Sequence, residues 1–212
     1  MKGFGNVLII GDSYSTFNGF NPDGYLYWYP QGGSSKSHTD VKRVEETWWH
    51  QLMKETDSTL VLNDSYSGST ICSTERESMP GTHFNLRCDG MIRDGFFKEN
   101  KIDTVFIFGG TNDSWIDSPI GNIKYDSISE DDISMILPAF SALISKIKDA
   151  SPDSRIIPLI NCDIKPEVAD GLEEICRHYG LTYIKFEELD KLSGHPSREG
   201  MKQIKDALIK LL

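Results

Sequence analysis

The chain has 212 residues, of which 38% are hydrophobic and 25% charged, a composition typical of a globular protein, and we predict a single domain over 1–212. Its apolar runs are too short to span a bilayer, so no membrane insertion is expected. The net charge of −10 repels phosphate backbones, which excludes nucleic acid as an expected partner.

The cysteines indicate no metal or redox site. They are widely separated, form no Cys-x-x-Cys pair and have no histidine at ligand spacing, so we interpret them as structural thiols and expect neither metal nor cofactor. These residues are Cys72, Cys88, Cys162 and Cys176. The first predicted strand begins almost directly after Met1, so the chain as written is expected to be cytoplasmic, with a trimmed leader as the alternative.

The first predicted strand ends in a potential nucleophile. Val7–Ile10 is a short apolar run, and Gly11 breaks it so that Asp12 and Ser13 follow at its carboxyl end. Ligands of open α/β sheets bind at the carboxyl ends of strands. A serine at this place can act as a nucleophile if a base reaches its hydroxyl and hydrogen-bond donors await the developing oxyanion.

A long loop is predicted after the serine, over 17–43. It is rich in Gly, Asn, Pro, Ser and aromatic residues, among them Tyr25, Tyr27, Trp28 and Tyr29. Loops of this length inside a compact domain are commonly functional. Two interpretations stay open: the aromatic side chains pin the loop to the body of the protein, or they form part of a lid over a substrate.

Strands and helices alternate along the rest of the chain. The hydrophobic patterns predict strands at 60–62, 104–108, 156–160 and 182–186 and helices at 44–54, 90–98, 131–150, 166–179 and 198–212, with an irregular stretch at 72–87. Pro138 is expected to kink its helix, and Pro158 suggests a strand near an edge or a bulge. The alternation predicts an α/β fold, a three-layer α/β/α sandwich around five parallel strands.

Three later stretches supply candidate partners for Ser13. Gly68 lies in the loop after the second predicted strand, Asn112 follows the third, and His195 follows the last. An imidazole can take the serine proton, and glycine N–H groups and amides can bind an oxyanion. Asp113, next to Asn112, and Asp12 are expected to hold their loops by accepting backbone N–H bonds.

Taken in order, Gly11-Asp12-Ser13, Gly68, Gly110-x-Asn112-Asp113 and His195 resemble the four sequence blocks of the SGNH hydrolases, also called the GDSL esterase/lipase family. The resemblance implies a flavodoxin-like sheet of strand order 2-1-3-4-5. It also implies that Ser13 is the nucleophile and His195 the base. The implied oxyanion hole consists of the backbone N–H groups of Ser13 and Gly68 and the side-chain amide of Asn112.

The chain departs from the family pattern at the third member of the triad. The usual last block is Asp-x-x-His, but Leu192 stands three residues before His195. Asp190 is the best carboxylate candidate, with Glu188 behind it, and a backbone carbonyl that orients the ring is the alternative. A second, milder departure is Tyr14, which replaces the aliphatic residue that commonly follows the serine.

These observations predict a serine esterase that cleaves a small acyl ester, with carbohydrate O-acetyl esters as the favoured substrate class. Tyr27, Trp28 and Trp115 are the candidates for stacking on sugar rings. A lysophospholipase or thioesterase would use the same machinery. Two non-catalytic alternatives are a flavodoxin-like module that binds phosphate or flavin at Gly11–Thr16, and a degenerate enzyme that retains only carbohydrate binding.

Overall fold

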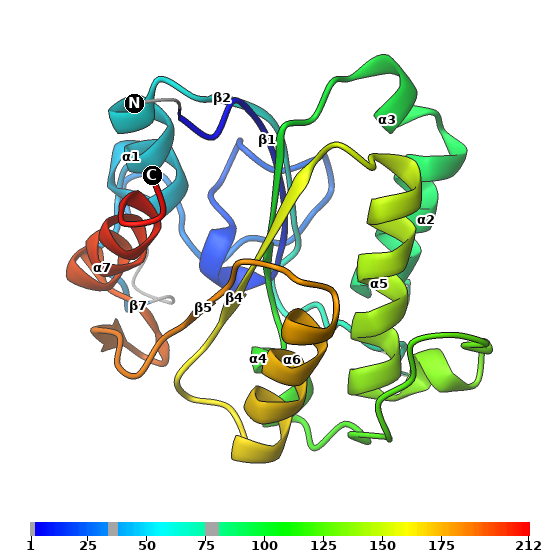
Figure 1. The fold of residues 1–212 in the computed structure, drawn as a ribbon. Helices are drawn as coiled ribbons and strands as arrows, with labels where there is room; N and C mark the ends of the chain where they lie inside the picture. The colour runs from blue at the N-terminus through cyan, green and yellow to red at the C-terminus, as the bar shows by residue number, and fades with distance from the viewer. Residues whose placement is uncertain (1–2, 34–37, 75–80) are drawn as a thin grey trace.

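Five parallel strands form the central sheet of the computed structural model, which describes residues 3–33, 38–74 and 81–212 (Figure 1). In chain order the strands are β1 (Asn6–Gly11), β2 (Thr59–Ser65), β3 (Thr104–Phe108), β4 (Arg155–Ile160) and β5 (Ile184–Lys185). Their order across the sheet is β2-β1-β3-β4-β5, which confirms the predicted order. Residues 34–37 and 75–80, parts of the predicted 17–43 loop and 72–87 stretch, lie outside the described residues.

Helices cover both faces of this sheet (Figure 1). On one face lie α1 (Trp48–Thr56) and α7 (Arg198–Ile209), and on the other α2 (Phe84–Arg93), α5 (Ile136–Ala150) and α6 (Pro166–His178). Successive side chains of a strand point to opposite faces, so β3 is buried on both: Phe106 packs in the α1 and α7 core, Ile107 in the other. The three-layer sandwich is confirmed.

The predicted helix at 44–54 is divided in two. A 3₁₀ turn, η2 (Val44–Glu46), comes first, and α1 starts only after Thr47, whose hydroxyl accepts the His50 N–H at 3.4 Å. Threonine favours such capping positions because its side chain replaces a missing helical acceptor. The buried face of α1 consists of Trp48, Trp49, Leu52 and Met53.

The kink expected at Pro138 is absent because the helix begins later than predicted. A separate 3₁₀ turn, η3 (Asp132–Ser134), precedes α5, so Pro138 is the third residue of that helix. The first turn of a helix has no intrahelical acceptors for its N–H groups, and a proline there loses no hydrogen bond. Pro158 lies just before Leu159 and Ile160, the residues of β4 that pair with β5, which agrees with the expected position near an edge.

The segment predicted as a helix at 90–98 is also different. α2 begins at Phe84, inside the stretch predicted to be irregular, because the His83 imidazole caps it by accepting the Leu86 N–H at 3.3 Å. Gly95, with φ of 79°, then separates α2 from the short α3 (Phe96–Glu99). A left-handed residue ends a helix, and glycine adopts that conformation without strain.

Two small elements near the carboxyl ends of the strands escape sequence patterning. α4 (Thr111–Trp115) follows β3, and a hairpin of β6 (Lys191–Leu192) and β7 (His195–Pro196) follows β5. Within the part of the chain that the structure describes, no cluster of three or more His, Cys, Asp or Glu side chains could hold a metal ion. No helix in the same residues is long and apolar enough to cross a bilayer.

Candidate active site

Ser13 lies where β1 ends, at the start of a short 3₁₀ turn, η1 (Ser13–Ser15). The cap of this turn is Asp12, whose carboxylate accepts the Tyr14 N–H at 3.0 Å, as expected for a loop-holding residue. The side chain of Ser13 is therefore not engaged in capping. Ser13 itself is 4% exposed, at the edge where the carboxyl ends of the strands meet.

His195 reaches this serine from the other end of the chain. Its Nε2 lies 2.9 Å from Ser13 Oγ, across a sequence separation of 182 positions. Its Nδ1 lies 3.0 Å from the backbone oxygen of Ser193. A carbonyl oxygen can only accept a hydrogen bond, so Nδ1 carries the proton and donates it. Nε2 is then the unprotonated nitrogen and accepts the Ser13 hydroxyl.

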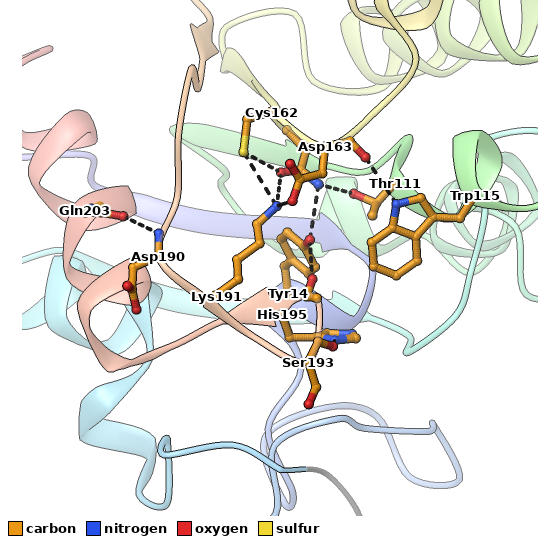
Figure 2. Close-up of polar contacts among 12 residues, drawn as sticks. Tyr14, Thr111, Trp115, Cys162, Asp163, Asp190, Lys191, Ser193, His195 and Gln203 are labelled. Atoms are coloured by element: carbon orange, nitrogen blue, oxygen red, sulfur yellow. Dashed lines mark hydrogen bonds and ion pairs between the residues drawn. The ribbon is translucent and has the colours of Figure 1, made fainter.

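The structure does not bring Asp190 to the imidazole, and that expectation is corrected. The Asp190 carboxylate accepts the Ser197 hydroxyl, and its backbone N–H donates to Gln203 Oε1 at 2.8 Å (Figure 2). Glu188 is exposed and makes no contact with the ring among the described residues. The physical reason is the hairpin: its two-residue turn, with φ of 49° at Ser193 and 76° at Gly194, places a main-chain carbonyl at Nδ1.

The hairpin that carries His195 is anchored to two other parts of the site. The Lys191 ammonium donates to Asn161 Oδ1 at 2.9 Å and to Asp163 at 2.6 Å, in the loop after β4 (Figure 2). The Tyr14 hydroxyl donates to the Gly194 carbonyl at 2.7 Å and accepts a 3.2 Å bond from Asn161 Nδ2. Both ends of the His195 turn are thereby tied to the segments that follow β1 and β4.

Two of the donors expected at the oxyanion, the Asn112 amide and the Gly68 N–H, lie in loops that are joined by a hydrogen bond. Asn112 lies in the first turn of α4, and one of the two hydrogens on its Nδ2 donates to the Ser69 carbonyl at 2.9 Å. Ser69 follows Gly68, which adopts a left-handed φ of 86°. The Ser69 hydroxyl in turn approaches the Gly11 carbonyl at 3.4 Å. These bonds join the loops after β1, β2 and β3 at one edge of the sheet.

Buried charges hold these loops in place. Arg87, from α2, pairs with Asp64 at the end of β2 and also donates to the Gly11 carbonyl at 3.1 Å and to Ser69 Oγ at 3.3 Å. Asp113 accepts the backbone N–H groups of the segment after Ser69, at 3.0 Å each. Its expected role as a loop-holding carboxylate is confirmed. A fully partnered buried ion can hold several backbone groups at once, because each of its lone pairs or protons is used.

The predicted aromatic residues have three different environments. Trp28 stacks face to face on His195, with ring centroids 3.6 Å apart and planes 7° apart. That face is therefore not available to a sugar. Tyr27 is 46% exposed, and Trp115 is 47% exposed, with its ring 6.1 Å from the imidazole and Nε1 donating to the Asp163 carbonyl at 3.1 Å.

The electrostatic setting favours a neutral imidazole. Burial lowers the pKa of His195 to about 4, the hydrogen bond to Ser193 opposes this shift, and the nearby Lys191 ammonium adds to it. Burial has the opposite effect on an acid and raises the pKa of Asp12 to about 7. At neutral pH the base therefore has a free lone pair, which proton abstraction requires.

Sequence reasoning missed most of the residues that hold the site. Arg87 and Asn161 lie outside the recognised blocks and Lys191 lies next to the last one, and only their contacts reveal their roles. Ser193 contributes a backbone atom, for which side-chain patterns give no signal. Tyr14 alone offered a clue, because an aromatic residue after the serine departs from the family pattern.

Comparisons with known proteins identify the family of the chain. The family model described as GDSL-like Lipase/Acylhydrolase matches residues 5–212. A structure described as a GDSL-like lipase from Bacteroides uniformis ATCC 8492 is similar, with 39% identity over 98% of this chain and 95% of that chain and a TM-score of 0.88. Another GDSL-like lipase structure, from Bacteroides ovatus ATCC 8483, has 37% identity over 98% and 96%, with a TM-score of 0.86.

A more distant match shares the fold alone. It is an active-site mutant of a family two carbohydrate esterase from Clostridium thermocellum, with 15% identity over 98% of this chain and 63% of that chain and a TM-score of 0.63. No curated protein matches the chain.

Proposed function

The chain belongs to the GDSL-like lipase/acylhydrolase family and is an ester hydrolase, and from this premise we propose that Ser13 and His195 perform the acyl transfer. The observation that carries the proposal is the 2.9 Å contact between Ser13 Oγ and His195 Nε2. Ser13 and His195 are 182 positions apart in the sequence, so the fold brings them into hydrogen-bonding distance. We propose in addition that 1–212 act as one domain around this single site.

The reaction proceeds through an acyl-enzyme. Ser13 Oγ attacks the ester carbonyl carbon while its proton passes to His195 Nε2, and the carbonyl oxygen becomes an oxyanion. When the tetrahedral intermediate collapses, the bond to the leaving alcohol breaks and Nε2 returns the proton to that oxygen. Water then attacks the acyl group on Ser13 with the same proton transfers. The products are an alcohol and a carboxylic acid, and the enzyme is regenerated.

The oxyanion is stabilised by the backbone N–H groups of Ser13 and Gly68 and by the Asn112 amide. Asn112 suits this role because one N–H is held by Ser69 at 2.9 Å, which orients the amide, and Nδ2 carries a second hydrogen. Each aligned donor contributes roughly 3 kcal/mol to the transition state.

The imidazole is oriented by a main-chain carbonyl in place of a carboxylate. The Ser193 oxygen, 3.0 Å from Nδ1, selects the tautomer that leaves Nε2 free, which is the orienting part of the role that an aspartate has in a triad. A neutral carbonyl stabilises the imidazolium less than an anion does. The pair therefore works as a Ser-His dyad with an oriented base.

Carbohydrate O-acetyl esters remain the substrate class that we favour. Tyr27 and Trp115 are aromatic and about half exposed, and Trp115 lies beside His195, where a ring could stack on a sugar. The carbohydrate esterase of similar fold supports this choice. The alternative substrates are a lysophospholipid or an acyl thioester, which would make the enzyme a lysophospholipase or thioesterase. A flavin- or phosphate-binding module is not supported, because the matching family model describes lipases and acylhydrolases.

The test compares wild type, Ser13→Ala and the control Ser134→Ala, whose serine is exposed in η3. We expect hydrolysis of p-nitrophenyl acetate and fluorophosphonate labelling by wild type and the control, and neither by Ser13→Ala. Equal rates in wild type and Ser13→Ala would remove Ser13 as nucleophile, and failure of wild type to be labelled would support the degenerate enzyme. Acetylated oligosaccharide, lysophosphatidylcholine and an acyl thioester, offered side by side, then decide the substrate class.

A further inference from the structure

The Trp28 indole covers one face of the His195 imidazole almost in parallel, with centroids 3.6 Å apart and an interplanar angle of 7°. His195 is 7% exposed, so most of the ring is withdrawn from water. The indole Nε1 has no hydrogen-bond partner among the described residues. A buried unpartnered donor has a free-energy cost, so a smaller apolar ring would fill this place more cheaply if packing alone mattered.

The segment that carries Trp28 is attached to both members of the catalytic pair. The Trp28 N–H donates to the Thr16 hydroxyl at 2.9 Å, and that hydroxyl donates to the Ser13 carbonyl at 3.0 Å. Next in the chain, the buried Tyr29 donates its hydroxyl to the Pro196 carbonyl at 2.9 Å, one residue after the base. Trp28 is thus linked on one side to the nucleophile, through Thr16, and on the other to the residue that follows the base, through Tyr29.

Among the described residues, the imidazole has no anionic partner that could stabilise its protonated form. The titratable groups around it are the Lys191 ammonium on β6, Tyr14 in η1, whose ring meets the imidazole edge-on, and Asp163 after β4, which is paired with Lys191. Asp113 in α4 is turned toward the segment after Ser69. No carboxylate of the described residues contacts the ring, yet the ring must become a cation in each catalytic cycle.

We propose that Trp28 is a positioning residue that fixes the plane of the His195 ring and stabilises its protonated form through the π face of the indole, in place of the missing carboxylate. This inference rests on the proposed function, since it is in acyl transfer that the imidazolium forms. The face of an indole carries negative potential and attracts a cation, most strongly when water is excluded. The effect does not need a hydrogen bond from Nε1.

The experiment uses Trp28→Phe and Trp28→Leu, which place apolar side chains of similar polarity at this position. Phenylalanine keeps a π face and leucine has none, so their difference isolates the ring from water exclusion. Phe20→Leu, 45% exposed in the same loop, is the matched control. Thermal unfolding checks that each variant folds, and Trp28→Met replaces the leucine variant if that one does not.

Two measurements are made on each protein. The first is kcat and KM for p-nitrophenyl acetate as a function of pH. We expect kcat to fall in the order Trp, Phe, Leu, by roughly three- to thirtyfold in Trp28→Leu, with KM little changed. The second is an NMR titration of the His195 ring, whose pKa is expected to fall in the same order, because a base that loses a partner for its protonated form becomes a weaker base.

A merely structural role predicts the opposite sign. If Trp28 only excludes water, its replacement rehydrates the ring, the pKa of His195 rises toward its ordinary value of about 6.5, and the Phe and Leu variants behave alike. That result overturns the inference. The NMR titration needs no turnover. If the wild type hydrolyses no ester but the pKa of His195 still falls from wild type to Trp28→Phe to Trp28→Leu, the proposed function alone is refuted. If esters are hydrolysed but the pKa values do not follow this order, this inference alone is refuted, and if neither result is found, both are refuted.

Discussion

The two sides of the catalytic pair are built from different kinds of groups. On the Ser13 side, buried ionic side chains hold the loops: Arg87 pairs with Asp64, and Asp113 accepts backbone N–H groups. On the His195 side, the ring contacts a neutral carbonyl and aromatic rings, and the nearest cation is paired elsewhere.

The difference follows from what each side does during a reaction cycle. On the Ser13 side, Arg87 and Asp64 form a buried ion pair that takes no part in the proton transfers, so it can hold the loops rigidly. The imidazole becomes a cation twice in each cycle, once in acylation and once in deacylation. A carbonyl and π faces tolerate both of its states, and they leave it neutral at rest, because burial lowers its pKa to about 4. His195 is therefore neutral and able to accept the Ser13 proton at rest, but the imidazolium that then forms is only modestly stabilised.

The largest expected effect comes from removing the base. His195→Gln keeps a polar side chain of similar reach but cannot take the Ser13 proton, so kcat should fall by about a millionfold, as for loss of the histidine of a triad. His178→Gln, an exposed histidine stacked on Tyr125, is the control and should keep wild-type kcat. A His195→Gln enzyme with more than a tenth of wild-type activity would mean that another group takes the proton.

On the Ser13 side, Arg87→Met removes the buried ion pair with Asp64. Both partners of the Arg87 and Asp64 pair are about 5% exposed, so the substitution leaves a buried carboxylate uncompensated and should lower the free energy of unfolding by about 3–5 kcal/mol. Urea unfolding measures this change. Arg93→Met, whose side chain is 72% exposed, should change stability by less than about 0.5 kcal/mol. Equal stabilities for the two variants would contradict the structural role of Arg87.

Asn112→Ala tests the donor that lies between the two sides. Loss of one oxyanion donor should lower kcat by about a hundred- to a thousandfold with little change in KM, because the bond matters only as the oxyanion forms. Asn122→Ala, at an exposed position, serves as the control. A rise in KM at constant kcat would instead assign Asn112 to ground-state binding.

The smallest effect on kcat is expected on the His195 side, for Asp190→Asn. The carboxylate accepts the Ser197 hydroxyl, which an amide oxygen can also do, and it does not contact the imidazole. Steady-state kinetics should therefore show a kcat within about threefold of wild type, because a local polar swap away from the reacting atoms costs little. A loss of a thousandfold would restore Asp190 as the third triad member and remove the contrast between the two sides.

Several features of the fold were predictable because they depend on local patterns. The strand at Thr104–Phe108 was placed with its bounds, since a short apolar run between polar residues has few other solutions. The helix predicted over 166–179 ends at His178, within one residue of its predicted end, because the left-handed Gly180 closes it. The errors came where a cap moved a boundary, as Thr47 does for α1, because capping depends on the backbone on both sides of the residue.

The sequence by itself determined which residues have the chemistry, a serine at the end of β1, an amide after β3 and an imidazole near the carboxyl terminus, because residue types and their order along the strands are written in the chain. Only the tertiary structure decided what surrounds them. The turn at Ser193 delivers a main-chain oxygen where a carboxylate was expected, and Trp28 stacks one face on the base. Such choices depend on contacts between segments distant in sequence, and these contacts arise only when the chain has folded.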